Sequence, residues 1–499
     1  MRWNPRGIDE KKIGEKIMRV NPNFVGTLDT LVRVSGDLEV EEISELGVQK
    51  LFLKASDVQR KLSELNVDER IQVFEDMGKI WEEKLRKGQF DALKRSLSES
   101  TGYSESLIEK ELTLVRSVFN GESLRRSLEA SFGNIEALWK FVEISRGEYK
   151  RYFPAGPVFI ISSGNSLIPP LIPTTISLLT GNMTILRPSI SNYNGVTEVY
   201  NILRTMNSDK ARLMSEGLAI SYFTHDSPSL KYLLTKAKVG VVNFWGGDPA
   251  RLEVSRLVSE NPHHPRLIIN GPLTGFVIVD EVSANEAIAE GLAKNVVLYD
   301  QQLCSSPTSA IFIGSIEKAK EFVNHMAASL NKYGSIYNAK LSESQIYLLQ
   351  SARRIFQIKG SIVYSSNDPQ NMWTVVLSKG KRVLDEVVST ITGFNIHFRR
   401  RFIEIVVVDK WHDVPTFIRE LPYCRAFTGV DKVQTVGLAV SDEIKHDLLE
   451  DLVNCGVYRI VPVADMYLRS PLEPYDGLNI PSSFTYIVYM RDRTLDFNL

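Results

Sequence analysis

The feature that most constrains the fold is a series of short apolar runs that begins near residue 150. Runs rich in Val, Ile and Phe alternate with polar turns and helix-like stretches: PVFIISS, MTILRPS, LAISYFT, KVGVVNFWGG, PRLIIN and GFVIVD, then TSAIFIG, IEIVVVDK, TVGLAVS and GVYRIVPV. Such strands, separated by helices, are typical of parallel sheets that helices cover on both faces. The sequence therefore predicts two doubly wound α/β units, the second with its first helix at 282–298.

The two ends of the chain have a different pattern. From about residue 48 to 145, apolar residues recur at three- and four-residue spacing, as in RIQVFEDMGKIWEEKLRKG, which predicts a mainly helical region. Near the other end, SSFTYIVYMRDRTLDF alternates and is rich in aromatic residues, which predicts a terminal strand. A lone strand needs the edge of a sheet, either in its own chain or in a neighbouring subunit.

Composition excludes several classes of protein. The 499 residues carry 59 basic and 60 acidic side chains, well mixed, so there is no electrostatic footprint for nucleic acid. The 3 cysteines lack CxxC or Cys/His spacing, which argues against a disulfide framework or a metal site and favours a reducing, cytoplasmic setting. The charge-free stretch 152–186 contains five prolines and several polar residues, so we expect no membrane span there.

Several polar or glycine residues follow predicted strands, at the edge where open α/β sheets bind ligands. Arg187 and Ser189 end the strand in GNMTILRPS, although an arginine there could also form a surface ion pair. Gly246 and Gly247 follow the strand VGVVNF and precede a helix. Such a turn allows the backbone to approach a pyrophosphate at a helix N-terminus, and a plain tight turn is the alternative.

Two further residues could carry chemistry. Asn165, in the loop SSGNS after the strand VFIIS, could donate to a developing oxyanion or could cap a turn. Cys304 lies in DQQLCSSP, just before a strand, with polar neighbours on both sides. Such a loop can leave the sulfur accessible and stabilise its thiolate, whereas Cys424 and Cys455 fit the usual role of a small buried hydrophobic residue.

Taken together and in order, these segments resemble the landmarks of the aldehyde dehydrogenase superfamily. The segments are YFPAGPVFIISSGNS, GNMTILRPS, FWGGDPA, INGPLTGFVIVD and DQQLCSSP. Within the superfamily the chain is most similar to the acyl-CoA reductase family, whose best-known members are the long-chain fatty acid reductases of bacterial luminescence. The resemblance covers about residues 145–490, and QQLCSSP is its most specific part.

The resemblance implies a role for each matching residue. It places Cys304 at the catalytic nucleophile and Asn165 at the amide that shares the oxyanion hole with the Cys304 N–H. It places four residues at the dinucleotide: Arg187 and Ser189 at the adenosine ribose, and Gly246 and Gly247 at the pyrophosphate.

Three departures from the superfamily pattern bear on function. The glutamate that serves as general base is absent, and Ile268 and Asn270 stand at its candidate positions, so hydrolysis of a thioester is poorly supported. Ile190 replaces the glutamate beside the adenosine ribose, which relieves repulsion against a 2′-phosphate and favours NADPH. The segment that holds the nicotinamide ribose is not recognisable, and Glu404 is the only acidic candidate.

The resemblance implies an aldehyde dehydrogenase-like α/β fold in four regions. These are a helical N-terminal region that packs on the cofactor domain (1–145), a dinucleotide-binding domain (146–268), a catalytic domain carrying Cys304 (269–440) and a return segment with an oligomerisation strand (441–499).

The activity implied is reduction of a long-chain acyl-CoA, or another acyl thioester, to a fatty aldehyde through an acyl group on Cys304. The expected cofactor is NADPH, with NADH as the other candidate. The expected partners are further copies of the chain in a dimer or tetramer and an enzyme that donates the acyl group or consumes the aldehyde. The alternatives are a CoA-acylating aldehyde dehydrogenase with a shorter substrate and a cofactor-independent cysteine acyltransferase or thioesterase.

Overall fold

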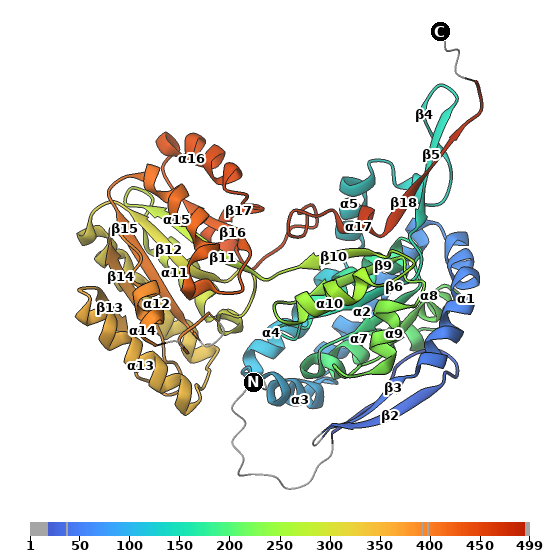
Figure 1. Cartoon of the computed structure of the whole chain (residues 1–499), viewed down its shortest axis with the longest axis horizontal. Helices are drawn as coiled ribbons and strands as arrows, with labels where there is room; N and C mark the ends of the chain where they lie inside the picture. Colours follow the sequence, from blue (N-terminus) through green and yellow to red (C-terminus); the bar gives the residue numbers. More distant parts are fainter. Residues whose placement is uncertain (1–17, 36–37, 392, 397–398, 495–499) are drawn as a thin grey trace. The chain divides into compact units, whose positions relative to one another are not determined.

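The chain divides into two compact units, each built on its own sheet (Figure 1). The computed structural model describes residues 18–35, 38–391, 393–396 and 399–494. The seven-stranded unit is made of Gly102–Ile108 and Gly271–Arg469. The five-stranded unit contains the described residues up to Thr101, the segment Glu109–Asn270 and the described residues from Ser470 onward.

The five-stranded unit contains a parallel sheet with the strand order β10-β9-β6-β7-β8. Its strands are β6 (Val158–Ile161), β7 (Thr184–Arg187), β8 (Leu218–Ile220), β9 (Val241–Trp245) and β10 (Arg266–Asn270). Side chains on both faces of β6 are buried: Val158 and Ile160 point to one face, Phe159 and Ile161 point to the other, and all four are nearly inaccessible to solvent. The sheet is therefore covered on both faces, as the continuous apolar runs predict.

Helices fill both faces of this sheet. Phe159 and Ile161 share an apolar core with residues of α1, α9 and α10, while α6 packs on β6 and β7. The helices assigned wholly to this unit are α1 (Glu45–Glu64), α2 (Val67–Arg86), α3 (Asp91–Thr101), α5 (Gly121–Phe132), α6 (Ile168–Leu179), α7 (Tyr193–Thr205), α8 (Asp209–Glu216), α9 (Pro228–Thr235), α10 (Ala250–Ser259) and α17 (Ile480–Ser483). Helix α4 (Glu105–Val118) includes residues assigned to each unit.

Three strands precede the helices of the N-terminal region. The sequence pattern, which is helical from residue 48, did not predict these strands. Strands β2 (Thr30–Ser35) and β3 (Leu38–Ile43) pair antiparallel, and β1 (Met18–Val20) pairs parallel with β3. In β3 the residues Leu38, Glu39, Val40 and Glu41 alternate between apolar and charged, which is the pattern of a half-buried strand. The helices expected between 48 and 145 are present as α1 to α5.

The seven-stranded unit contains a sheet with the order β13-β14-β15-β12-β11-β16-β17, parallel except for β13. Its strands are β11 (Leu273–Asp280), β12 (Pro307–Ile313), β13 (Ile362–Ser365), β14 (Thr374–Lys379), β15 (Phe402–Val408), β16 (Lys432–Ala439) and β17 (Arg459–Pro462). The prediction of a second doubly wound unit is confirmed.

Helices cover both faces of this sheet as well. Residues of α11 (Glu286–Val297) and α12 (Ile316–Ile336) form the core on one face. Residues of α13 (Glu343–Ile358), α14 (Leu384–Thr390), α15 (Val414–Glu420) and α16 (Asp442–Asn454) form the core on the other. The boundary expected after residue 440 falls inside this unit, because α16 packs on the sheet and β17 pairs with β16.

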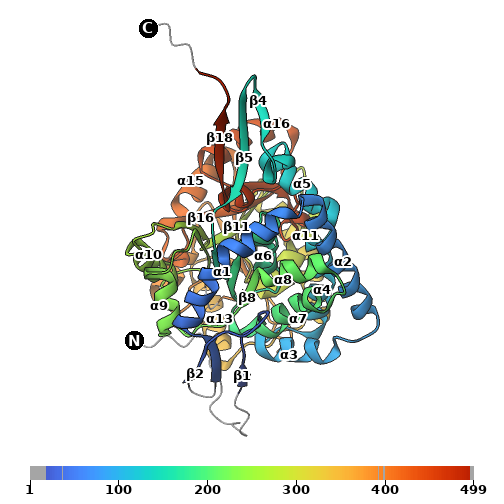
Figure 2. The same cartoon turned by 90° about the vertical axis from the view of Figure 1, so that its right-hand side faces the viewer.

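A three-stranded antiparallel ribbon projects from the body of the five-stranded unit (Figures 1 and 2). It consists of β4 (Val142–Ser145), β5 (Glu148–Pro154) and β18 (Thr485–Arg491). The terminal strand predicted from sequence thus finds a partner in its own chain, with Ile487 opposite Tyr152. Among the described residues its other edge pairs with no strand, and Ile487 is 60% exposed there.

No helix within the described residues is both long enough and apolar enough to cross a membrane. The uncharged stretch 152–186 forms instead the end of β5, the buried strand β6, helix α6 and most of β7.

Candidate active site

The strands of the five-stranded sheet run in one direction, so the loops that follow them gather at one edge. Strands β7 and β9 both pair with β6, which places Arg187 and Phe244 opposite Ile161. The loop after β6 carries Asn165, β7 ends at Arg187, and Gly246 follows β9. The fold thus brings these three predicted site residues to the carboxyl edge of a parallel sheet, where open α/β sheets bind ligands.

The loop that carries Asn165 is held by hydrogen bonds to the loop after β7. The Ser163 hydroxyl donates to Asn165 Oδ1 over 2.8 Å, which orients the side-chain amide. Ser191 donates its hydroxyl to the Gly164 carbonyl over 3.1 Å, and the Asn192 amide donates to the Ser163 carbonyl over 3.3 Å. A side chain at Gly164 would collide with the neighbouring serines, so small residues are required for this close approach.

A buried carboxylate that the sequence did not reveal supports the same loop. Glu111 is 2% exposed and accepts from the Leu167 N–H over 2.6 Å and from the Ser166 hydroxyl. Leu167 caps the N-terminus of α6, where a negative charge is favourable. Nothing in the local sequence around Glu111 signals this role, because the contact joins α4 to a loop 56 residues away.

Arg187 is buried and held in place by the main chain that follows β8. Its Nε and Nη2 donate to the Phe223 carbonyl over 3.1 and 3.0 Å, and its guanidinium lies 4.8 Å from the centre of the Tyr222 ring. Burial lowers the pKa of Arg187 from its ordinary value. Beside it, the Ser189 and Ser191 hydroxyls lie 3.1 Å apart. The cation and hydroxyl predicted at this strand end are therefore both present at the sheet edge.

A second carboxylate in this region comes from the unexpected strand β3. Glu42 is fully buried and accepts from the Ser227 hydroxyl over 2.6 Å and from the Thr224 N–H over 3.4 Å. Burial raises the pKa of Glu42, and its charge acts on Arg187. Although position 190 holds isoleucine and not glutamate, Arg187 therefore still has an acidic side chain, Glu42, in its surroundings.

Gly246 and Gly247 form the turn between β9 and α10. The Gly246 N–H donates to the Asn270 carbonyl over 3.1 Å, and the Gly247 carbonyl accepts from the Arg251 N–H over 3.0 Å. Arg251 also makes a bidentate ion pair with Asp248, at 2.7 and 3.1 Å. The two glycines thus precede the N-terminus of a ten-residue helix at the ligand-binding edge, which fits the approach of a pyrophosphate.

The positions where the superfamily has its general base hold no free carboxylate. Ile268 is buried on β10, and Asn270 belongs to a chain of buried hydrogen bonds. Asn243 donates to Asn270 Oδ1 over 2.9 Å, and Asn270 donates to Asp476 over 3.1 Å. Asn270 therefore holds strands and loops together and is not placed to activate water.

The loop before Cys304 has an unusual backbone. Tyr299, Asp300 and Gln301 all have positive φ angles, of 52°, 50° and 63°. Non-glycine residues adopt this conformation at a cost, so the surrounding structure must hold it. Gln301 does so with its side chain, which donates to the Pro307 and Phe402 carbonyls over 2.6 and 2.7 Å and accepts from the Phe402 N–H over 2.9 Å. This glutamine therefore joins the starts of β12 and β15.

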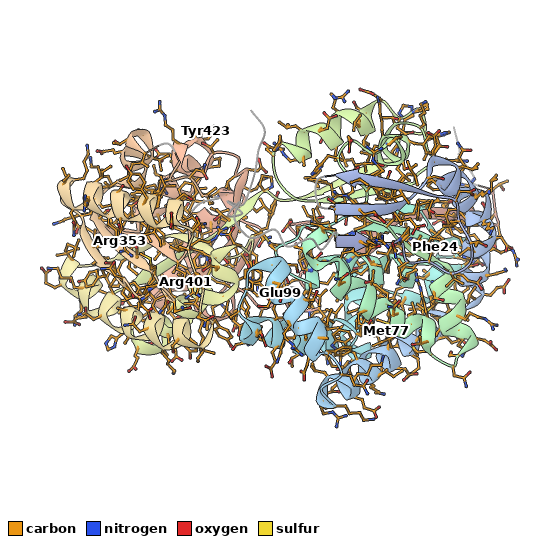
Figure 3. All side chains as sticks on the ribbon, turned by 90° about the horizontal axis from the view of Figure 1, so that it is seen from below. Phe24, Met77, Glu99, Arg353, Arg401 and Tyr423 are labelled. Carbon is orange, nitrogen blue, oxygen red and sulfur yellow. The ribbon has the colours of Figure 1, made fainter. Side chains whose placement is uncertain are left out.

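A buried ion pair supports the same strained segment. Arg401 Nε donates to Asp300 Oδ1 over 2.9 Å, and the two side chains are only 3% and 13% exposed. Arg401 also donates to Asn371 Oδ1 over 2.7 Å and to the Tyr337 carbonyl. Figure 3 places Arg401 among the side chains inside this unit. The basic cluster before β15 thus contributes an internal support for the Cys304 loop.

Cys304 itself is partly buried in the turn that leads into β12, and it is not in a disulfide. Gln434 Nε2 donates to its sulfur over 3.1 Å. The other two cysteines lie in different surroundings, since burial raises the pKa of the Cys424 thiol to about 11 and also raises that of Cys455. The Cys424 sulfur also accepts a hydrogen bond, from Arg382 Nη1 over 3.0 Å, so Cys304 differs from it by its place in the turn before β12 and by the neutral amide that donates to its sulfur. Gln434 was not identified from the sequence.

Glu404, expected at the nicotinamide ribose, also has a structural role. It lies in the middle of the sheet on β15, fully buried, and both carboxylate oxygens accept hydrogen bonds. The donors are the Ser378 hydroxyl at 2.6 Å and the N–H groups of Val383 and Leu384 at 2.7 and 3.1 Å. The last two belong to the start of α14, so Glu404 anchors that helix to the sheet, and its place at the nicotinamide ribose stays a prediction.

Solved structures with a similar fold include several aldehyde dehydrogenases. Aldehyde dehydrogenase 21 from Physcomitrella patens, in complex with succinate, matches with a TM-score of 0.69 at 13% identity over 96% of this chain and 99% of its own. Glyceraldehyde-3-phosphate dehydrogenase from Methanocaldococcus jannaschii, complexed with NADP, matches with a TM-score of 0.63 at 13% identity, over 91% of this chain and 95% of its own. The fold is therefore that of the aldehyde dehydrogenase class.

Sequence comparisons narrow the class to a family. The family model described as acyl-CoA reductase (LuxC) matches residues 62–484. A long-chain acyl-protein thioester reductase from Vibrio harveyi is 26% identical over 367 residues, 72% of this chain and 73% of that protein. One from Aliivibrio fischeri is 24% identical over 276 residues, about half of each chain. The chain belongs to the acyl-CoA reductase family.

Proposed function

We propose that the chain reduces a long-chain acyl thioester to an aldehyde through an acyl group carried on Cys304. The observation that carries the proposal is the Cys304 sulfur, which is partly buried in the turn before β12 and faces an amide donor. The names of the Vibrio harveyi and Aliivibrio fischeri relatives support an acyl thioester as the substrate. The acyl donor is coenzyme A or a thioester on a protein.

The reaction begins with attack by the Cys304 thiolate on the thioester carbonyl, which expels the donor thiol. By resemblance to the superfamily, the Cys304 N–H and the Asn165 amide would stabilise the oxyanion, and one such donor contributes on the order of 3 kcal/mol. The dinucleotide, when bound, supplies the hydride for reduction. Collapse of the thiohemiacetal then breaks the carbon–sulfur bond, returns the electron pair to Cys304 and releases the aldehyde.

The residues at the positions of the superfamily's general base favour reduction of the acyl-enzyme over its hydrolysis. Ile268 has no polar side chain, and the Asn270 amide is committed to Asn243 and Asp476. Neither can activate water against the acyl group, whereas transfer to a thiol and reduction need no such base. These residues therefore support an acyl group that persists on Cys304 until it is reduced.

The edge of the five-stranded sheet fits a dinucleotide. Gly246 and Gly247 precede the N-terminus of α10, where the pyrophosphate would bind, and Arg187 with Ser189 would meet the adenosine ribose. Arg187 and the absence of a carboxylate at Ile190 support NADPH, and NADH is the other candidate. The Glu42 carboxylate is occupied by hydrogen bonds from the Ser227 hydroxyl and the Thr224 N–H.

The open edge of β18 supports assembly of several copies. Its outer edge pairs with no described strand, and its exposed side chains include Ile487 and Tyr489, at 60% and 54% exposure. We propose a homo-oligomer formed through this strand. A separate enzyme that supplies the acyl group or consumes the aldehyde is the other expected partner.

Intact-mass measurement with a long-chain acyl-CoA and no reductant tests the acyl-enzyme. The wild type should gain the mass of one acyl group, and Cys304→Ala should gain none. Cys424→Ala and Cys455→Ala are matched controls that should still be acylated. Addition of NADPH should release the aldehyde and restore the original mass. An adduct that persists in Cys304→Ala, or no adduct in the wild type, would overturn the proposal.

A further inference from the structure

The seven-stranded sheet is irregular on both sides of Gly275. In the pairing with β16, Thr274 faces Val433 and Gly275 faces Thr435, so Gln434 is an extra residue. In the pairing with β12, Gly275 faces Pro307 and the next residue faces Ser309, so an extra residue lies there as well. A β-bulge of this kind changes the direction of a side chain and is common beside active sites.

The Cys304 loop lies directly against this irregular point. The Gly275 N–H donates to the Ser306 carbonyl over 3.0 Å. A side chain at Gly275 would collide with the Ser305 and Ser306 carbonyls, which belong to the main chain and cannot move aside easily. Glycine at this position therefore lets the loop sit on β11, next to the bulge that carries Gln434.

The Gln434 side chain has a defined orientation toward the sulfur. It is fully buried, and its Oε1 accepts from the Thr435 hydroxyl over 3.1 Å. With the oxygen held in this way, Nε2 points its N–H at Cys304 Sγ over 3.1 Å. A hydrogen bond to a charged group favours the charged form, so this donor favours the thiolate over the thiol.

We propose that Gln434 is a positioning residue that holds the Cys304 sulfur as a thiolate for the acylation reaction. The catalytic part of this inference rests on the proposed function. The same donor acts a second time when the thiohemiacetal collapses, because the electron pair of the broken carbon–sulfur bond returns to the sulfur that Gln434 faces. An amide serves here without taking or giving up a proton, and no histidine is required.

The pH dependence of alkylation of Cys304 by iodoacetamide tests the inference without any substrate. The measurement is made in a Cys424→Ser, Cys455→Ser background, so that one thiol reacts. Gln434→Met removes the donor at similar volume, and we expect the apparent thiol pKa to rise by about one unit, with a tenfold lower alkylation rate near neutral pH. Gln434→Glu keeps the acceptor for Thr435 and should raise the pKa of the Cys304 thiol further, because the carboxylate repels the thiolate.

Gln302→Met is the matched control, because it removes from the same loop an amide that donates to the Asp300 carbonyl over 3.3 Å. Its alkylation profile should match that of the background. Thermal melting identifies any variant that fails to fold. An unchanged pKa in a folded Gln434→Met would overturn the inference. A raised pKa together with no acylation in the wild type would leave the inference standing and reject the proposed function.

Discussion

The edges of the two sheets that carry the predicted site residues are built in different ways: Asn165 and Arg187 lie at the carboxyl edge of the five-stranded sheet, and Cys304 lies at the amino edge of the seven-stranded sheet, before β12. At the five-stranded sheet, Asn165 and Arg187 are held by hydroxyl groups and main-chain carbonyls of neighbouring loops. At the seven-stranded sheet, the Cys304 loop has three consecutive positive φ angles and depends on side chains from distant strands, including Arg401 and Gln434. Both edges also receive buried side chains from distant segments, such as Glu111 at the Asn165 loop, but the Cys304 loop in addition holds three consecutive non-glycine residues at positive φ, which the surrounding structure must stabilise.

The largest effect is expected at the buried ion pair that supports the strained turn. Arg401→Met leaves the nearly buried Asp300 without its main partner, and loss of one partner of a buried pair lowers the free energy of unfolding by about 3 kcal/mol or more. Urea denaturation measures the change. Arg256→Met is the control, since its partners Glu253 and Glu260 are exposed, and we expect less than about 1 kcal/mol. Equal losses of unfolding free energy in the two variants would show that the Arg401–Asp300 pair supports the Cys304 turn no more than an exposed ion pair would.

The next largest effect is expected at Arg187, where a substitution should change dinucleotide binding but not the reactivity of the Cys304 thiol. Arg187→Met should weaken NADPH binding roughly tenfold, equivalent to about 1.4 kcal/mol, because the cation at the end of β7 is lost. A fluorescence titration with NADPH and with NADH measures this, and a larger loss for NADPH would place Arg187 near the 2′-phosphate. Alkylation of Cys304 should stay unchanged. Undiminished affinity for both dinucleotides would remove Arg187 from the cofactor site.

The smallest effect concerns the dependence of stability on pH. Burial raises the pKa of Glu42 above the ordinary value of 4.5, so the folded state favours its protonated form. Its contribution to stability is fully present below pH 4.5 and is lost as the pH rises through the raised pKa. Relative to Glu42→Gln, the wild type should therefore gain stability as the pH falls from neutral. Parallel denaturation curves for the two proteins at pH 7 and pH 5 measure this, and a constant difference would contradict the assignment.

Much of the site was predictable because it follows strands that the sequence marks clearly. Asn165, Arg187 and Gly246 each come directly after an apolar run, and parallel pairing brings such positions to one edge. Cys304 was distinguished from the other cysteines by its polar neighbours in the same way. The hydrogen bonds from Glu404 to the start of α14 could not be predicted, because a glutamate in an apolar run gives no sign of which groups its carboxylate contacts.

The residues that were missed share one property, which is that their contacts join distant segments. Gln434 lies 130 residues from Cys304, and Glu111 lies 56 residues from Leu167. Glu42 comes from a strand that the helical spacing of the front region did not predict. No local pattern distinguishes such side chains from ordinary surface or strand residues.

The sequence by itself determined the two doubly wound sheets and the loops that carry Asn165 and Arg187, and it singled out Cys304 as the predicted nucleophile. Hydrophobic period and turn residues are local properties, and they suffice to place these features. Only the tertiary structure decided what holds the Cys304 turn and what faces its sulfur. A bulge in β16 turns Gln434 toward Cys304, and Arg401 reaches Asp300 from the start of the neighbouring strand β15, because strand register and burial depend on the whole unit and not on neighbours in the chain.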